Sequence, residues 1–318
     1  MRMCWGLSVA VVVPTYRRPA ELQKCLQAIE GQNSPPDEIL VVHRAVGDPE
    51  TEAVATGWAS QPGLTARRTV IVDRPGQVAA MEAGVQAAVG AIIVFLDDDV
   101  RIRPDWIERC LQHYRNPRVV GVGGRDAVHD RWSATYTPRA RVGQISWFGR
   151  VSGNHHRGFG VARPVDVLKG ANMSLRREYC VFDHRLQGAG SQIHNDSHLC
   201  LQARKRGGVI MYDPNCVADH YPAQRHDEDQ RGAPSRGAIS SVVHNEVYMM
   251  LTYLRWWQKG PFLLYTFLVG HRGSWAVLRW LSGYVSGERI SVTDQLVPSY
   301  QGKVRGLRTW LTTIRKGA

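Results

Sequence analysis

The chain has 318 residues, 43% of them hydrophobic and 21% charged, and a formal net charge of +12. Its length and composition are ordinary for a globular protein of one large domain or two, and no segment has the roughly 18 uninterrupted apolar residues of a membrane-spanning helix. The positive charge favours anionic partners such as nucleotides, nucleic acid or an anionic membrane surface, without selecting among them.

Strands and helices are predicted to alternate over the first hundred residues. Apolar, β-branched runs predict the strands, and apolar residues at helical spacing predict the helices. Such alternation is typical of a doubly wound α/β fold with a parallel sheet. No G-x-G-x-x-G fingerprint follows the first strand, which disfavours nicotinamide chemistry. The predicted strands are 8–13, 38–43, 69–72 and 91–96, and the predicted helices are 20–30, 51–60 and 77–89.

The fourth predicted strand leads directly into three carboxylates, Asp97, Asp98 and Asp99. In open α/β sheets, ligands bind at the carboxyl ends of the strands. Adjacent carboxylates repel each other unless a positive charge neutralises them, and a hard divalent cation shared with a substrate phosphate would do so. An acidic turn or helix start is the alternative for such a run.

The second hundred residues are less regular. A segment as long as 125–163, without clear periodicity and rich in Gly, Arg, His and aromatic residues, is typical of a functional loop region. A turn entering a strand is predicted within 165–177. The remaining predicted elements are helix 105–114, strand 119–124, helix 196–206 and strand 209–213, which ends at Pro214.

The composition changes after about residue 222. Residues 224–236 are polar, whereas 242–282 are helical in pattern and dense in aromatic residues. This stretch either packs on the sheet domain or contacts an anionic membrane surface through interfacial Trp and basic side chains. From residue 224 onward there are 13 Lys and Arg against 6 Asp and Glu, which favours the membrane. We predict a sheet domain at 1–222 and a helical, aromatic and basic C-terminal extension at 223–318.

The six cysteines are scattered, without any C-x-x-C pair, and several lie in apolar segments. This pattern is typical of reduced core cysteines and disfavours a zinc site. We therefore expect a cytoplasmic protein, which could also bind peripherally at the inner face of the plasma membrane. No signal peptide is recognised, because the apolar run near the start is short and reads as the first strand.

Five motifs follow one another at residues 11–18, 95–99, 170–174, 195–199 and 212–220. Their order and spacing resemble the family 2 glycosyltransferases, over roughly residues 8–222. The resemblance implies the GT-A fold, a Rossmann-like doubly wound mixed sheet flanked by helices, here with a C-terminal helical extension. It also implies a metal-dependent inverting enzyme. Such enzymes move a sugar from a UDP-, GDP- or dTDP-sugar to a hydroxyl of a glycan or a lipid-linked acceptor.

The resemblance implies a bound Mn²⁺ or Mg²⁺ that stabilises the leaving nucleoside diphosphate. By position, Asp99 is the first metal ligand, and His220 is a further metal contact that Asp219 helps to orient. Asp97 and Asp98 would contact the ribose hydroxyls or a metal-bound water. The alternatives are loop capping for each aspartate and a structural role for the histidine.

The nucleotide site is expected at the ends of the first three strands. Relatives usually have an acidic residue directly after the second strand, but here His43 occupies that place and Asp48 follows five residues later. Asp73, after the third strand, is a second candidate for the nucleobase. The expected donor-binding residues are Pro14, Thr15, Tyr16, Arg17, Asp48, Asp73, Gln77, Asp97 and Asp98.

Asp196 is the expected general base, because an acceptor hydroxyl must lose a proton as it attacks the anomeric carbon. Asn195 stands where the family has a first acid. The alternative for Asp196 is the capping of a helix. An acceptor-side turn is expected from Gly170, Asn172 and Met173, together with Asn195, and a plain turn is the alternative.

Three other functions remain open at this point. The chain could be a catalytically inactive nucleotide-sugar binding protein of the same fold. It could be a basic nucleic-acid-binding protein, although its basic residues are dispersed and no zinc-finger or RNP pattern occurs, so no specific nucleic acid is expected. A nucleotidyltransferase would usually have a Gly-rich basic loop after the first strand, which is absent.

Overall fold

The computed structural model describes residues 6–44, 46–130, 136–226, 234–287 and 291–317. The chain divides into two compact units, which are described separately. The first comprises Met1–Gln144, Ser152–Phe182 and Leu199–Ala223, and the second comprises Ile145–Val151, Asp183–His198 and Gln224–Ala318. The prediction of two consecutive domains therefore lacked the two middle segments that belong to the second unit.

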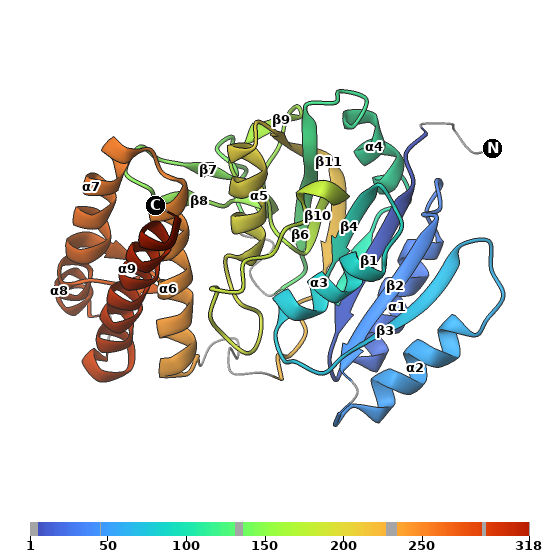
Figure 1. Cartoon of the computed structure of the whole chain (residues 1–318), viewed down its shortest axis with the longest axis horizontal. Helices are drawn as coiled ribbons and strands as arrows, with labels where there is room; N and C mark the ends of the chain where they lie inside the picture. The colour runs from blue at the N-terminus through green and yellow to red at the C-terminus, as the bar shows by residue number, and fades with distance from the viewer. Residues whose placement is uncertain (1–5, 45, 131–135, 227–233, 288–290, 318) are drawn as a thin grey trace. The chain divides into compact units, whose positions relative to one another are not determined.

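A mixed sheet forms the centre of the first unit (Figure 1). Its described strands are β1 (Val9–Thr15), β2 (Glu38–Arg44), β3 (Ala66–Val72), β4 (Ile92–Leu96), β5 (Val100–Ile102), β6 (Val119–Val128), β9 (Arg163–Val165), β10 (Asn172–Arg176) and β11 (Val209–His220). They are arranged in the order β3-β2-β1-β4-β10-β6-β11-β5, with β9 paired to β11. The strands β1 to β4 are parallel, β10 is antiparallel to both β4 and β6, and β11 is parallel to β6. The carboxyl ends of β1–β4, β6 and β11 therefore lie at one edge.

Helices cover both faces of this sheet. They are α1 (Pro19–Glu30), α2 (Pro49–Ala59), α3 (Gln77–Ala87), α4 (Trp106–His113) and the part of α5 (Asn195–Lys205) that belongs to this unit. Alternate residues of β1 face opposite sides, as a strand requires. Val11 and Val13 belong to the core formed with α1, α2 and α4, whereas Val12 packs against Gly84 of α3. The α/β fold expected from the alternating pattern is confirmed.

The structure differs from the sequence prediction along β6 and β11. β6 continues to Val128, and β11 continues past Pro214 to His220. The register of β11 against β6 is irregular between Asp213 and Ala218, so Pro214 sits where the ladder is interrupted. The short strand β5, directly after the three aspartates, pairs antiparallel with the end of β11 and was not predicted.

The second unit is mostly helical. It contains α6 (Arg236–Tyr253), α7 (Trp256–Leu264), the π-helix η4 (Tyr265–Val269), the two-stranded β12 (Gly270–His271) and β13 (Ser274–Trp275), α8 (Val277–Val285), the π-helix η5 (Val292–Leu296) and α9 (Val297–Gly317). The remaining short elements of the chain are β7 (Gln144–Ile145), β8 (Val151–Ser152), η2 (His155–Arg157) and η3 (Arg177–Tyr179). None of the helices in the described ranges is both long and apolar enough to cross a bilayer.

The described cysteines are buried and carry free thiols; they are Cys25, Cys110, Cys180, Cys200 and Cys216. Cys4 lies outside the described residues. Burial raises the pKa of Cys110 to about 12, so its thiol stays protonated and behaves as a small apolar side chain.

Candidate active site

The three aspartates lie at the edge where the parallel strands end, directly after β4. They have different partners. Asp97 Oδ1 accepts a hydrogen bond of 3.2 Å from the amide of Gln77. Asp98 Oδ2 accepts one of 2.8 Å from the hydroxyl of Thr15, and its Oδ1 lies 2.7 Å from a guanidinium nitrogen of Arg18. Asp98 is therefore held by the end of β1 and the start of α1.

Asp99 faces the end of β11. Antiparallel pairing sets His220 opposite Val100, the residue after Asp99, and His220 Nε2 lies 3.3 Å from Asp99 Oδ1. The other oxygen, Oδ2, accepts a hydrogen bond of 2.9 Å from the backbone N–H of Ala223. This corner places one carboxylate and one imidazole side by side at the sheet edge.

A second carboxylate, Asp126, holds His220 from behind. It lies near the end of β6, which pairs with β11, and its Oδ1 is 3.0 Å from His220 Nδ1. Lys169 forms an ion pair with the other oxygen of Asp126. The Asp126 side chain is fully buried, so this pairing fixes the orientation of the imidazole.

The electrostatics separate the three neighbouring aspartates. Burial raises the pKa of Asp98 to about 7 despite the opposing charge of Arg18. Burial also disfavours ionisation of Asp99, but His220, the Ala223 N–H and Arg18 together hold its pKa below the usual value. Burial opposes a charged His220, yet Asp126 and Asp99 raise its pKa to about 9. Asp99 is thus the member of the trio whose surroundings favour the ionised form.

The corner fits a divalent cation that takes most of its ligands from elsewhere. His220 is 4% exposed, and among the described residues its Nε2 has no hydrogen-bond partner, although it faces the Asp99 carboxylate at 3.3 Å. The described residues contain no group of three or more His, Cys, Asp or Glu side chains arranged as a complete metal site. Mn²⁺ and Mg²⁺ commonly use few protein ligands and complete their shell with substrate phosphates and water. Asp99 and His220 are the side chains of this corner that could offer an oxygen and a nitrogen to such a cation.

The residues expected to bind the nucleotide lie at the same edge, but they differ in accessibility. Asp48 is 4% exposed, accepts the backbone N–H of Arg17 and caps α2 through Thr51. Asp73 follows β3 and is exposed. The carboxylate of Asp48 thus shapes the loop after β1, while Asp73 faces solvent.

The loop after β1 is set in an unusual backbone conformation. Arg17 has a φ of 55°, and the Asp48 carboxylate holds its N–H. Tyr16 lies under the guanidinium groups of Arg17 and Arg44, at 5.1 and 4.6 Å from the ring centroid. Pro14 is half-buried at the end of β1. These contacts make the loop a basic, aromatic rim of the edge.

His43 is a polar side chain of this region that has no role in the sequence prediction beyond replacing an acid. It lies in β2 beside Thr15 of β1 and is 1% exposed. Neither of its ring nitrogens makes a hydrogen bond within the part of the chain that the structure describes.

The residues expected to contact the acceptor differ in how deeply they are buried. Asn172 is 1% exposed; its Oδ1 accepts a hydrogen bond from Trp106, and its Nδ2 donates to the carbonyls of Arg125 and Cys216. Met173 is fully buried in β10. Both side chains tie strands together and are inaccessible to an acceptor, contrary to expectation. Gly170 is half-buried in the turn before β10.

The second unit contains Asn195 and Asp196. Helix α5 begins at Asn195, so Asp196 lies in its first turn, half-buried, and accepts a hydrogen bond from the N–H of Ser197. The amide of Asn195 donates to the carbonyls of Ser191 and Gln192. Asn195 thus stabilises the turn that leads into α5 and supplies no carboxylate.

Buried polar residues of α6 hold this turn in place, and sequence reasoning missed them. The amide of Asn245 accepts from Gln187 N–H and donates to the carbonyls of Gln187 and Ile193. Three successive polar residues, 244–246, inside the otherwise apolar stretch 242–251 were the available signal. Asp126 and Lys169 were also missed, because only the pairing of distant strands brings them to His220.

Asp219 points away from its neighbour His220. Its carboxylate accepts hydrogen bonds from Arg103, at 3.0 and 3.2 Å, and lies 2.9 Å from a ring nitrogen of His129. The expectation that Asp219 orients His220 is therefore wrong, because alternate residues of a strand face opposite sides. Asp126 holds that position instead.

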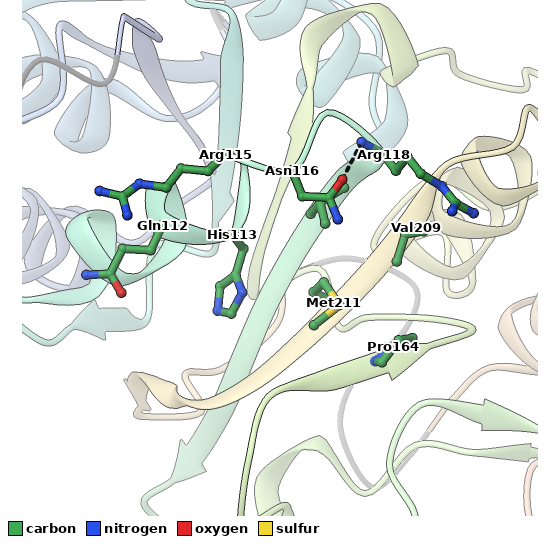
Figure 2. A pocket seen from close by; sticks show the side chains of 9 residues that line it. Gln112, His113, Arg115, Asn116, Arg118, Pro164, Val209 and Met211 are labelled. Atoms are coloured by element: carbon green, nitrogen blue, oxygen red, sulfur yellow. Dashed lines mark hydrogen bonds between the residues drawn. The ribbon is translucent and has the colours of Figure 1, made fainter.

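A pocket of about 510 Å³ lies at the opposite ends of β6 and β11, near Val119 and Val209 (Figure 2). Its lining includes Pro164 and Met211 beside basic residues of the α4–β6 connection. It includes no expected site residue. The acidic edge and this pocket are separated by the length of the strands.

A model of the family described as "Glycosyl transferase family 2" matches residues 10–180, more than half of the chain. Glycosyltransferase AglE of Haloferax volcanii is 32% identical over 119 residues, covering 36% of this chain and 38% of that protein. The glucosyl-dolichyl phosphate glucuronosyltransferase of the same organism is 26% identical over 226 residues, covering 67% and 69%. The chain thus spans well under half of the first relative and about two thirds of the second.

Two solved structures resemble the fold. GalNAc-T7 with UDP, GalNAc and Mn²⁺ has a TM-score of 0.57 at 13% identity, covering 89% of this chain and 57% of that chain. The mannosyltransferase PcManGT of Pyrobaculum calidifontis with GDP-Man and Mn²⁺ has a TM-score of 0.52 at 16% identity, covering 96% and 87%. At these identities the likeness concerns the fold, and it confirms the expected GT-A architecture.

Proposed function

The chain belongs to glycosyl transferase family 2, and from this premise we propose that it is a metal-dependent inverting enzyme that uses a nucleoside diphosphate sugar. The observation that carries the proposal is the corner of Asp99 and His220, with Asp126 behind the imidazole. It lies at the carboxyl edge of the parallel strands, where open α/β sheets bind ligands. Within the residues that the structure describes, no comparable feature favours the alternative functions left open by the sequence.

Asp99 and His220 are the residues that would hold the cation. When bound, a divalent cation would neutralise the charge that develops on the leaving diphosphate. Asp126 accepts a hydrogen bond from the Nδ1–H of His220, so that deprotonation of Nε2 would leave its lone pair pointing toward Asp99. Such a carboxylate behind a ligating histidine fixes its tautomer and orientation. We assign Asp126 as a positioning residue.

On the donor side, Asp73 is the better candidate for a nucleobase contact. Asp48 is buried and occupied by the Arg17 N–H and the cap of α2, so its contribution is the shape of the loop. Asp73 is exposed after β3. Tyr16 and the arginines that stack on it provide an aromatic and basic surface for the nucleotide. Gln77 and Thr15 hold the carboxylates of Asp97 and Asp98, to which we assign the ribose hydroxyls.

Asp196 is the proposed general base. In a single displacement, the acceptor hydroxyl gives its proton to the Asp196 carboxylate while its oxygen bonds to the anomeric carbon. The bond from that carbon to the diphosphate oxygen breaks, and the electron pair leaves with the nucleoside diphosphate. Attack from the face opposite the leaving group inverts the anomeric centre. Asn245 supports this chemistry indirectly by holding the turn before α5.

A glycan or lipid-linked hydroxyl is the proposed acceptor. One relative, by its name, acts on glucosyl-dolichyl phosphate, and another is named an undecaprenyl-phosphate 4-deoxy-4-formamido-L-arabinose transferase, from Pectobacterium carotovorum. These names motivate a polyprenyl-linked acceptor for this chain.

The test separates an enzyme from an inactive binding protein. We expect Asp196→Asn to lower turnover by about 10²- to 10⁴-fold, the contribution of a general base, while donor binding in the presence of Mn²⁺ is retained. The control is Asp294→Asn, which removes an exposed carboxylate that pairs with Arg236 on the surface of the second unit. Equal turnover of the Asp196→Asn variant and the wild type would contradict the proposed base.

A further inference from the structure

Helix α8 carries its apolar side chains on the outside. Its residues Val277, Leu278, Leu281, Tyr284 and Val285 are 44%, 52%, 45%, 77% and 86% exposed. At 3.6 residues per turn they span an arc of about 120° on one side of the helix. Gly283, on the opposite side, is the buried residue of α8. A helix of a globular protein normally buries such an apolar stripe.

The exposed apolar surface continues onto the last residue of α7 and onto η4, which packs against α8. Leu264, Leu268 and Val269 are 64%, 52% and 43% exposed. We call these three side chains and the five of α8 the α8–η4 face. Soluble monomers rarely expose so many contiguous apolar residues, and such patches mark interaction sites.

The charge around this face selects the kind of partner. Arg272 is exposed in the turn between β12 and β13, and β12 contacts both η4 and α8. The sequence has no Asp or Glu between residues 256 and 287. A basic side chain beside an apolar face, with no acidic residue nearby in the sequence, complements an anionic lipid surface. A second copy of the same face would bring like charges together, so charge disfavours self-association here.

We propose that the α8–η4 face docks on an anionic lipid bilayer, with its leucines and valines among the acyl chains near the headgroups. Tyr284 has a ring that is apolar and a hydroxyl that stays in the polar layer, which suits this depth. Arg272, exposed beside the face, would contact the anionic headgroups. Docking would bring the enzyme close to a lipid-linked acceptor, and this use of the face rests on the proposed function. The docking itself does not.

The direct test is flotation with vesicles of phosphatidylcholine alone or with phosphatidylglycerol. The wild type should float with the anionic vesicles and bind the neutral ones more weakly. The Leu278→Asp/Leu281→Asp variant changes two exposed side chains, so it should fold normally yet lose at least tenfold in partitioning. The matched control, Leu64→Asp/Val89→Asp, alters two exposed apolar residues of the first unit, 100% and 73% exposed, and should float like the wild type.

Three results would overturn the proposal. The first is wild-type protein that stays in solution with anionic vesicles. The second is a Leu278→Asp/Leu281→Asp variant that floats as well as the wild type. The third is a wild type that sediments as a dimer, becomes monomeric in that variant and does not bind vesicles, which would make the face a contact between two copies.

A nucleotide-binding measurement distinguishes a failure of the docking proposal from a failure of the proposed function. Stabilisation by UDP or GDP with Mn²⁺ should be the same in wild type and in the Leu278→Asp/Leu281→Asp variant. Vesicle binding without any nucleotide effect would contradict the proposed function and leave the docking face standing. Nucleotide binding without vesicle binding would do the reverse.

Discussion

At the scale of single residues, the site depends on which carboxylate holds His220. Asp219 precedes His220 in β11 and Asp126 lies in the neighbouring strand β6. Of these two carboxylates, only that of Asp126 faces the imidazole. The distinction matters, because a partner that fixes the ring of a ligating histidine contributes to metal affinity without touching the metal.

We expect Asp126→Asn to weaken Mn²⁺ binding by about tenfold to a hundredfold, the usual effect of losing such a partner. The measurement is titration calorimetry with Mn²⁺ in the presence of a nucleoside diphosphate, which needs no turnover. Asp219→Asn is the matched control, since it removes a neighbouring carboxylate that binds Arg103 and His129 instead. Equal losses in the two variants would argue against a positioning role for Asp126.

Part of this site could be predicted from local sequence. Asp97–Asp99 follow an apolar strand, and the end of a parallel strand is where ligand contacts are expected. Asp126 and Lys169 could not, because 94 residues separate Asp126 from His220 and only strand pairing brings them together. Asn172 was misjudged for a related reason. Its polar groups are occupied by Trp106 and two carbonyls, which no local pattern reveals.

At the scale of elements, the parallel strands and the helices between them were predicted well because their periodicity is strong. The predicted end of β11 was wrong. Proline normally ends a strand, but Pro214 lies where the pairing of β11 with β6 is irregular, and the strand continues beyond it. The π-helices and the middle segments of the second unit carry no sequence signal of comparable strength. Their conformation is decided by packing between distant residues, such as Asn245 against the 187–193 turn.

The contact between α6 and α9 depends on two glycines of α9. A Cβ on Gly306 would lie 2.7 Å from the backbone oxygen of His244, and one on Gly302 would lie 2.5 Å from that of Ser240. Because the obstructing atoms are backbone, the helices would have to move apart. The close approach of these two helices therefore requires glycine at both positions.

We expect Gly306→Ala to lower the free energy of unfolding by about 1–3 kcal/mol, the usual cost of overpacking. Gly260→Ala is the control, because Gly260 lies in α7 and no described atom beyond its own helix backbone and chain neighbours lies within 4 Å of a new Cβ. There the better helix propensity of alanine should raise stability by about 0.5–1 kcal/mol. Urea denaturation compares the two variants, and a Gly306→Ala protein as stable as the wild type would contradict the close-packed contact.

At the scale of the whole molecule, stability should depend on pH through Lys303. This side chain is fully buried, and its ammonium group donates to the carbonyl of Trp275. Burial lowers the pKa of Lys303 from 10.5 to about 8, against the favourable charge of Glu246. Between these two values the unfolded chain binds more protons than the folded one, so stability attributable to this group rises with pH.

We therefore expect the wild type to gain stability relative to Lys303→Met between pH 8 and 10.5, by on the order of 3 kcal/mol at most. Other titrating groups are common to both proteins and cancel in the difference. Urea denaturation at several pH values, followed by tryptophan fluorescence, measures it. A difference that stays constant over this range would show that the Lys303 ammonium is not destabilised by burial.

The central claim concerns the whole acidic edge: that Asp99 and His220, in a family 2 glycosyltransferase, hold a divalent cation together with the diphosphate of the donor. The most direct measurement is the electron paramagnetic resonance signal of free Mn²⁺, titrated with protein and UDP or GDP. The wild type with at least one of these nucleotides should deplete the signal beyond what the nucleotide does alone, and Asp99→Asn should not. Depletion by Asp99→Asn equal to that by the wild type, or none by either protein, would contradict the account.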